Sequence, residues 1–189
     1  KKFIYNINIK NYMKNNTETT VKYTSSLKSN TSVEETSNVK FRYDIRCFDT
    51  EGNLKWEEQI SNLVTTVGKN DLIDKYFKGT TYTATWFLGL KGAGSVVVGD
   101  TLASHGGWSE VNPYAGNRPA ITFGTTSGGS NTATLISFSI TGTATCAGAF
   151  ICSVNTGTGG ILYSAADFAV SRSVINGDTL QVTPTVTMT

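Results

Sequence analysis

Side chains that perform acid–base and metal chemistry are scarce in this sequence. It contains one histidine, His105, and three cysteines among 189 residues. No serine lies in a nucleophile-elbow pattern, and a nucleophile would have only His105 as its base, so a catalytic triad is not expected. Cys47, Cys146 and Cys152 also lack the short spacing of zinc ligands. We therefore expect no enzyme activity, no metal and no other cofactor.

The cysteine count is odd, which argues against a disulfide framework. Cys146 and Cys152 fall on the same face of one predicted strand, about 20 Å apart at the rise of a β-strand, so they cannot bond to each other. We expect three buried, reduced thiols, as in proteins of a reducing compartment.

Charge is scarce in the second part of the chain. Residues 1–79 contain 13 Lys or Arg and 10 Asp or Glu, whereas residues 80–189 contain 3 and 4. Four acids in that part are few for a glycosidase carboxylate pair, and no glycine-rich phosphate loop is present. The net charge of +2 is too small for a nucleic-acid binder. No apolar run approaches the roughly 20 residues that cross a bilayer, so neither nucleic acid nor membrane is an expected partner.

What the sequence does contain is β-strand material. Gly, Thr, Ser and Ala alternate with single large apolar residues after Gly79, a composition typical of twisted strands joined by tight turns. This predicts a mainly β chain, an antiparallel β-sandwich of jelly-roll type over residues 41–189. Pro184 cannot donate to a ladder, which predicts a sheet edge or a bulge there. After Gly79, strands are expected at 82–90, 120–123, 132–141, 145–154, 161–163 and 179–188.

A β-hairpin is predicted over residues 41–66. Every second residue from Phe41 to Cys47 is apolar, residues 49–53 are turn formers, and the alternation resumes at Leu54 and Trp56.

One short helix is predicted over residues 70–78, with Asn70 as its N-cap and Gly79 as its terminator. The apolar residues of this segment recur at helical spacing, so we expect them to pack on a sheet. They are Leu72, Ile73, Tyr76 and Phe77.

Residues 1–40 are predicted to form an extended N-terminal arm. Phe3, Tyr5 and Ile7 alternate as in a strand that needs a partner surface, which makes them candidate partner-binding residues. The polar stretch that follows is also typical of a disordered tail, and this alternative stays open.

A long loop-like segment over residues 104–119 supplies the other candidate binding residues. Aromatic, amide and arginine side chains gather there, as they do in protein interfaces and carbohydrate sites. The alternative is a structured loop whose own aromatic residues pack on the core. The candidate residues are Trp108, Glu110, Tyr114, Asn117 and Arg118.

One short motif occurs twice. Gly-Asp-Thr-Leu stands at 99–102 and again at 177–180. Gly-Asp before a β-branched residue is a common turn into a strand, so we interpret the repeat as shared turn chemistry.

From Asn62 onward, spaced motifs resemble a family of virion-associated proteins of tailed bacteriophages. Each motif is weak alone, and residues 1–40 lie outside the resemblance. The matching features are Asn62-Leu63-Val64-Thr65-Thr66 with Gly68, Trp86 with Gly89-Leu90, Gly99 to His105 with Gly107-Trp108 and Glu110, Tyr114, Arg118-Pro119, Gly148-Ala149-Phe150, Leu162-Tyr163-Ser164-Ala165, Arg172 and Gly177-Asp178-Thr179-Leu180.

The resemblance implies a virion structural role without catalytic residues. We expect a capsid decoration or cement protein that binds the major capsid protein, forms a homo-oligomer such as a trimer, and resides in virions assembled in the bacterial cytoplasm. The first alternative is a tail or head-fibre component whose loop around Trp108 binds a host glycan. A second alternative is a secreted or surface β-sandwich adhesin.

Overall fold

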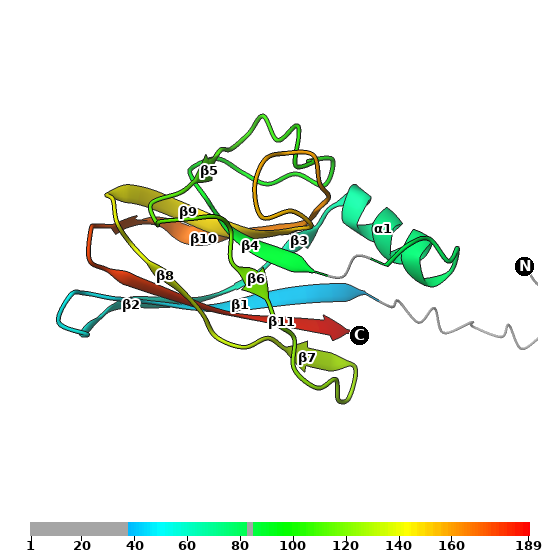
Figure 1. Ribbon diagram of the computed structural model, residues 1–189, viewed down its shortest axis with the longest axis horizontal. Coiled ribbons are helices and arrows are strands. Elements are labelled where there is room, and N and C mark those ends of the chain that lie inside the picture. Colours follow the sequence, from blue (N-terminus) through cyan, green and yellow to red (C-terminus); the bar gives the residue numbers. More distant parts are fainter. Residues whose placement is uncertain (1–37, 83–84) are drawn as a thin grey trace, which may run out of the picture. The chain divides into compact units, whose positions relative to one another are not determined.

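The computed structural model describes residues 38–82 and 85–189. Two antiparallel β-sheets pack face to face, and one helix lies at the end of the sandwich where β1 begins and β11 ends (Figure 1). The predicted mainly β sandwich is therefore confirmed. The extended arm predicted for residues 1–40, with Phe3, Tyr5 and Ile7, lies outside the described residues up to position 37.

The first sheet is built on its two longest strands, β1 and β11, which pair along their whole length. The hairpin partner of β1 forms one edge, and two short strands pair with successive stretches of β11 on its other side. The strands are β1 (Val39–Phe48), β2 (Leu54–Ser61), β7 (Ser130–Thr132), β8 (Ile136–Ser139) and β11 (Thr179–Met188).

The second sheet has the order β3-β10-β9-β4, and two short strands pair with different parts of β4. Its β10 is far longer than the 161–163 segment expected from the sequence. The strands are β3 (Leu63–Val64), β4 (Trp86–Lys91), β5 (Glu110–Val111), β6 (Ala120–Ile121), β9 (Ala144–Cys152) and β10 (Leu162–Val174).

The core lies between the sheets and follows the alternation seen in the sequence. Phe41, Tyr43, Ile45 and Cys47 are all buried on the inner face of β1. The Tyr43 hydroxyl crosses the core to Ser164 Oγ at 3.3 Å, so a buried polar group has a partner in the opposite sheet. Cys47, Cys146 and Cys152 are buried and free, as predicted.

The predicted β1–β2 hairpin is present, but the span 41–66 is too long. The Asp49 carboxylate accepts hydrogen bonds from the backbone N–H groups of Glu51 and Asn53, and Gly52 has a φ of 84°, which shapes the turn. Strand β2 ends at Ser61, and Leu63–Val64 pairs with β10 in the other sheet. The chain thus changes sheets at Asn62.

Pro184 lies in a central strand, so the predicted sheet edge is wrong, but the pairing on one side of it shifts by one residue, as in the bulge that was the other prediction. Strand β8 pairs with β11 up to Val182, and β7 resumes the pairing at Thr185. Pro184 O accepts the Ala133 N–H on that side. In a strand the N and O of one residue face the same neighbour, so the missing N–H of Pro184 faces the interval between β8 and β7.

The helix α1 (Thr66–Tyr76) begins earlier than predicted. Its N-cap is Thr65, whose Oγ1 accepts the Gly68 N–H at 3.1 Å and donates to Leu162 O at 2.5 Å. The prediction of Asn70 as the cap is therefore wrong, because Thr65 is anchored to β10 by contacts that the sequence does not reveal. Gly79 follows the helix with a φ of 74°.

The repeated Gly-Asp-Thr-Leu motif forms two equivalent turns, as interpreted. Asp100 N–H donates to Val97 O and Asp178 N–H donates to Ile175 O, both at 3.0 Å. In return, the Asp100 carboxylate accepts a hydrogen bond from the Val97 N–H, and the Asp178 carboxylate accepts one from the Ile175 N–H. The motif therefore marks two Asp-stabilised turns into adjacent segments.

Candidate functional site

The loop that the sequence favoured as a binding surface turns its large side chains inward. Trp108 is buried, its Nε1 donates to Asp100 Oδ2 at 2.9 Å, and the His105 ring stacks on it with 4.0 Å between centroids. His105 Nδ1 also contacts Trp108 O at 2.9 Å. These contacts fit the alternative of a structured loop, and they leave the Trp108 ring little surface for a partner.

Arg118 is a second internal anchor of this loop. Its guanidinium donates to both Glu110 carboxylate oxygens, at 2.7 and 2.6 Å, and to the carbonyls of Val154 and Gly157, each at 3.0 Å. It also lies over the Phe150 ring at 5.3 Å. The hydrogen bonds to Glu110 raise the pKa of Arg118. Arg118 therefore joins two loops instead of facing outward.

The remaining loop candidates differ in accessibility. Tyr114 is buried and its ring packs on Phe138 with 4.6 Å between centroids. Asn117 is exposed, and the Glu110 side chain is partly exposed although it holds Arg118. Of the five candidate residues, Asn117 is therefore the one that is fully open to a partner, and its binding role stays a prediction.

Sequence reasoning missed Lys91 as a buried charge. The side chain has no exposed surface, and Nζ lies 2.6 Å from Asp167 Oδ1, 3.0 Å from Gly92 O and 2.5 Å from Gly94 O. It also lies over the Trp108 ring at 5.6 Å. The available signal was a lone lysine in the apolar strand sequence WFLGLK. With its protons held by three acceptors, Lys91 stabilises the loop and has no free position for chemistry.

The described part of the chain shows no arrangement for metal binding or thiol chemistry. Among residues 38–82 and 85–189 there is no group of three or more His, Cys, Asp or Glu that could hold a metal ion. Burial raises the pKa of the Cys47 thiol to about 11 and that of Cys146 to about 12. These thiols stay protonated near neutral pH and are poor nucleophiles. No helix in the described ranges has the length and apolar character to span a membrane.

The outer face of α1 carries large apolar side chains into solvent. Ile73, Tyr76 and Phe77 lie three and four residues apart, on one side of the helix, and are 54%, 79% and 77% exposed. The Tyr76 and Phe77 rings pack edge to face with 5.1 Å between centroids. The prediction that this stripe packs on a sheet is therefore wrong for these three residues. We call them the α1 outer face.

The inner side of α1 carries smaller and charged residues instead. Gly68 and Asp71 are buried, and Leu72 and Lys75 are half-buried. A Cβ on Gly68 would overlap the backbone of Tyr163 in β10, so glycine allows the close approach of helix and sheet. Since the sheet takes this side of the helix, the apolar residues are left facing outward.

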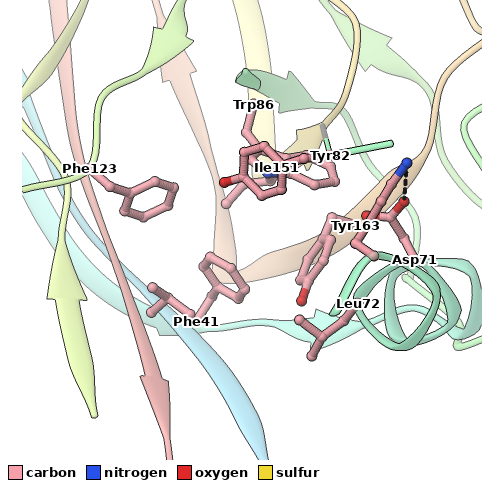
Figure 2. Close-up of a pocket in the computed structure, with 10 residues that line it drawn as sticks. Phe41, Asp71, Leu72, Tyr82, Trp86, Phe123, Ile151 and Tyr163 are labelled. Atoms are coloured by element: carbon pink, nitrogen blue, oxygen red, sulfur yellow. Dashed lines mark ion pairs between the residues drawn. The ribbon is translucent and has the colours of Figure 1, made fainter. Parts of the chain in front are cut away.

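A cavity of about 170 Å³ lies beside α1. Figure 2 shows aromatic rings on its different sides, with Asp71 and Leu72 of α1 at one edge. The walls come from both sheets, from α1 and from the segment before β4. They are Phe41, Asp71, Leu72, Lys75, Tyr82, Trp86, Phe123, Ile151, Tyr163 and Val186.

Tyr163 organises the aromatic walls of this cavity. Its ring packs edge to face on Phe41 at 5.5 Å and on Trp86 at 5.0 Å between centroids. Burial, together with the nearby Asp71 carboxylate, raises the pKa of Tyr163 to about 12. Tyr82 also lines the cavity while 75% exposed, so it lies at the opening. The arrangement suits binding of an apolar group.

The α1 outer face and the adjoining cavity form the candidate functional site. The sequence signal was present in Tyr76, Phe77 and Tyr82, but helical spacing alone suggested a buried stripe. Comparison of the chain with family models and with curated proteins gives no match in either case.

Proposed function

We propose that this protein is a non-enzymatic structural component of a tailed-phage virion that binds a protein partner through the α1 outer face. The specific role proposed is that of a capsid decoration or cement protein on the major capsid protein. The exposed aromatic pair Tyr76 and Phe77 carries the proposal, because clustered exposed apolar side chains mark sites of protein association.

Two further observations support this role. The motifs from Asn62 onward resemble virion-associated proteins. The internal use of Trp108 and Arg118 also leaves the α1 outer face as the most aromatic surface of the described residues that is open to a partner. The glycan-binding fibre alternative relied on exposed aromatic side chains in the Trp108 loop, and the burial of Trp108 and Tyr114 gives it no support.

The experiment that tests the proposal is cosedimentation of the purified protein with shells assembled from the major capsid protein of the same phage. A Tyr76→Ser/Phe77→Ser variant is expected to bind the shells at least about tenfold more weakly, as for truncation of an interface hot spot. The matched control is Leu135→Ser/Val170→Ser, which removes two exposed apolar side chains elsewhere. Equal binding by both variants would contradict the proposed surface.

Cryo-electron microscopy of the particle separates the virion roles. Density for this protein that repeats over the icosahedral shell is expected for a decoration protein. Density confined to one vertex or to the tail would instead support the fibre alternative.

A further inference from the structure

The cavity beside α1 has room for one ring. Its volume of about 170 Å³ is close to the roughly 150 Å³ of an engineered apolar cavity that binds benzene. Sites for drug-sized ligands begin at about 300 Å³. A single side chain of an apolar or aromatic residue therefore fits.

The walls favour an aromatic occupant. Phe41, Trp86 and Tyr163 come from three different strands, and Figure 2 shows their rings and that of Phe123 around a common space. The edge-to-face contacts of Tyr163 with Phe41 and Trp86 leave other ring faces and edges toward the cavity. A further ring placed there could adopt the offset or edge-to-face geometry that aromatic side chains prefer.

The charges in the wall favour a neutral occupant. The two ionisable side chains of opposite sign, Asp71 and Lys75, are already paired, with 3.7 Å between Asp71 Oδ1 and Lys75 Nζ. A cationic ligand would lose its hydration without gaining an unpaired counter-charge, and it would meet the Lys75 ammonium. The aromatic walls therefore do not make a cation-binding cage here.

The cavity borders the inner side of α1, next to the α1 outer face along the helix. Leu72 and Lys75 of α1 line it, while the adjacent Ile73 and Tyr76 face solvent. Tyr82 is exposed at its opening. A partner that covers the α1 outer face and extends to Tyr82 would also cover the opening of the cavity.

We infer that this cavity is a binding site for one neutral aromatic ring, and that the ring is a phenylalanine or tyrosine side chain of the protein partner. The second half of the inference rests on the proposed function. It assigns the cavity the role of an anchor pocket at the centre of the interface, where a buried aromatic residue commonly supplies much of the affinity.

Methyl NMR of the full chain tests the ring site without the partner. Toluene and p-cresol represent the two side chains, and tetramethylammonium is a compact cation for comparison. We expect both aromatic probes, and not the cation, to give saturable ring-dependent shifts at the methyl groups of Leu72, Ile151 and Val186, which line the cavity. The exposed Leu54 in β2 serves as the remote methyl control.

Filling the cavity should remove the binding. Leu72→Phe is expected to weaken probe binding at least about tenfold, as for loss of a well-packed site, whereas Leu54→Phe makes the same change elsewhere and leaves it unaltered. Val186→Phe is a second filling variant, and unchanged Ile45 methyl resonances establish that each variant is folded. Absence of saturable shifts in the full chain, equal binding of tetramethylammonium, or unchanged affinity in both folded filling variants would overturn the ring site.

The shell-binding measurement separates the two halves of the inference. Leu72→Phe should weaken shell binding while Leu54→Phe does not, and p-cresol should compete with the shells. Ring binding without either effect would overturn the assignment of the ring to the partner. Normal shell binding by Tyr76→Ser/Phe77→Ser would instead contradict the proposed function, while the NMR result for the ring site would stand.

Discussion

Lys91 Nζ lies 2.6 Å from Asp167 Oδ1, although the Lys91 side chain is fully buried and the Asp167 side chain is 41% exposed. Water reaches one partner of this ion pair and not the other. The buried Lys91 ammonium therefore needs the Asp167 carboxylate more than the partly hydrated carboxylate needs Lys91. Removing one partner should lower the free energy of unfolding by a different amount than removing the other.

Asp167→Asn is expected to destabilise the protein more than Lys91→Met. The first change leaves a buried ammonium with only carbonyl partners and should cost about 2–3 kcal/mol of unfolding free energy. The second removes the buried charge and leaves an exposed carboxylate, so about 1–2 kcal/mol is expected from the lost bonds to Gly92 and Gly94. Urea denaturation measures both values.

The control for this pair is Glu57→Gln, which breaks the exposed ion pair with Arg46. It should change stability by less than about 0.5 kcal/mol. A larger loss for Lys91→Met than for Asp167→Asn would show that the buried charge is not the dominant effect.

Gly68→Ala is expected to destabilise the protein despite the higher helix propensity of alanine. Alanine normally gains about 1 kcal/mol over glycine within a helix. Here its Cβ would overlap the Tyr163 backbone, so we expect a net loss of about 2 kcal/mol as α1 moves away from β10. Thermal unfolding measures the change. Gly99→Ala is the control, because its Cβ would meet no atom within 4 Å, and a stabilised Gly68→Ala would contradict the close packing.

Arg118→Lys should cost about 2 kcal/mol although it keeps the positive charge. Lysine cannot bind both Glu110 oxygens and also reach the carbonyls of Val154 and Gly157. Arg42→Lys is the matched control at an exposed site with a single bond to Asp44, and should be nearly neutral. Equal urea midpoints for the two variants would rule out a structural role for the paired hydrogen bonds between the Arg118 guanidinium and Glu110.

Stability should fall at alkaline pH. In the folded state the pKa of Cys47 is raised from 9.0 to about 11, and those of Cys146 and Tyr43 to about 12. Above pH 9 the unfolded chain loses protons that the folded chain retains, so unfolding becomes more favourable as pH rises toward 11–12. Below pH 9 these groups are protonated in both states and their stabilising effect is complete. Each fully mismatched group contributes at most about 1.4 kcal/mol per pH unit.

Urea midpoints measured between pH 7.5 and 10.5 check this expectation. Titration of these three groups should leave the midpoints unchanged up to about pH 9 and lower them above it. The decline should be shallower in Cys146→Ala, which lacks one of the three groups. The same burial predicts that a thiol reagent labels the folded protein slowly at pH 8 and the urea-unfolded protein rapidly. Rapid labelling of the folded state would contradict it.

The strands could be predicted because their signal is local. Phe41 to Cys47 and Ile136 to Ile140 alternate with period two, and the inner residues are buried as the pattern requires. The central place of the strand that contains Pro184 could not be predicted in this way. Whether a strand is central depends on which other strands pair with it, and the interval between β8 and β7 has no signature near residue 184.

The candidate site shows a different limit of sequence reasoning. Helical spacing correctly grouped Ile73, Tyr76 and Phe77 on one face, but the same spacing describes a buried stripe and an exposed binding face. Which face of α1 turns toward the sheet is decided by Thr65 and Gly68. Their contacts with β10 involve residues about a hundred positions away in the sequence. Trp108 and Arg118 raised the same difficulty, since interfaces and internal networks use the same residue types.

The pairing of β1 with β11 has a consequence for how the chain folds. Val39 pairs with Met188, so the centre of the first sheet joins the two ends of the described domain. During synthesis, β1 cannot pair with β11 until β11 has left the ribosome, so the first sheet is completed only then. Because such distant contacts are formed late and at a high entropic cost, folding should be slow, with the edge of β1 open to unwanted pairing until residues 179–188 arrive.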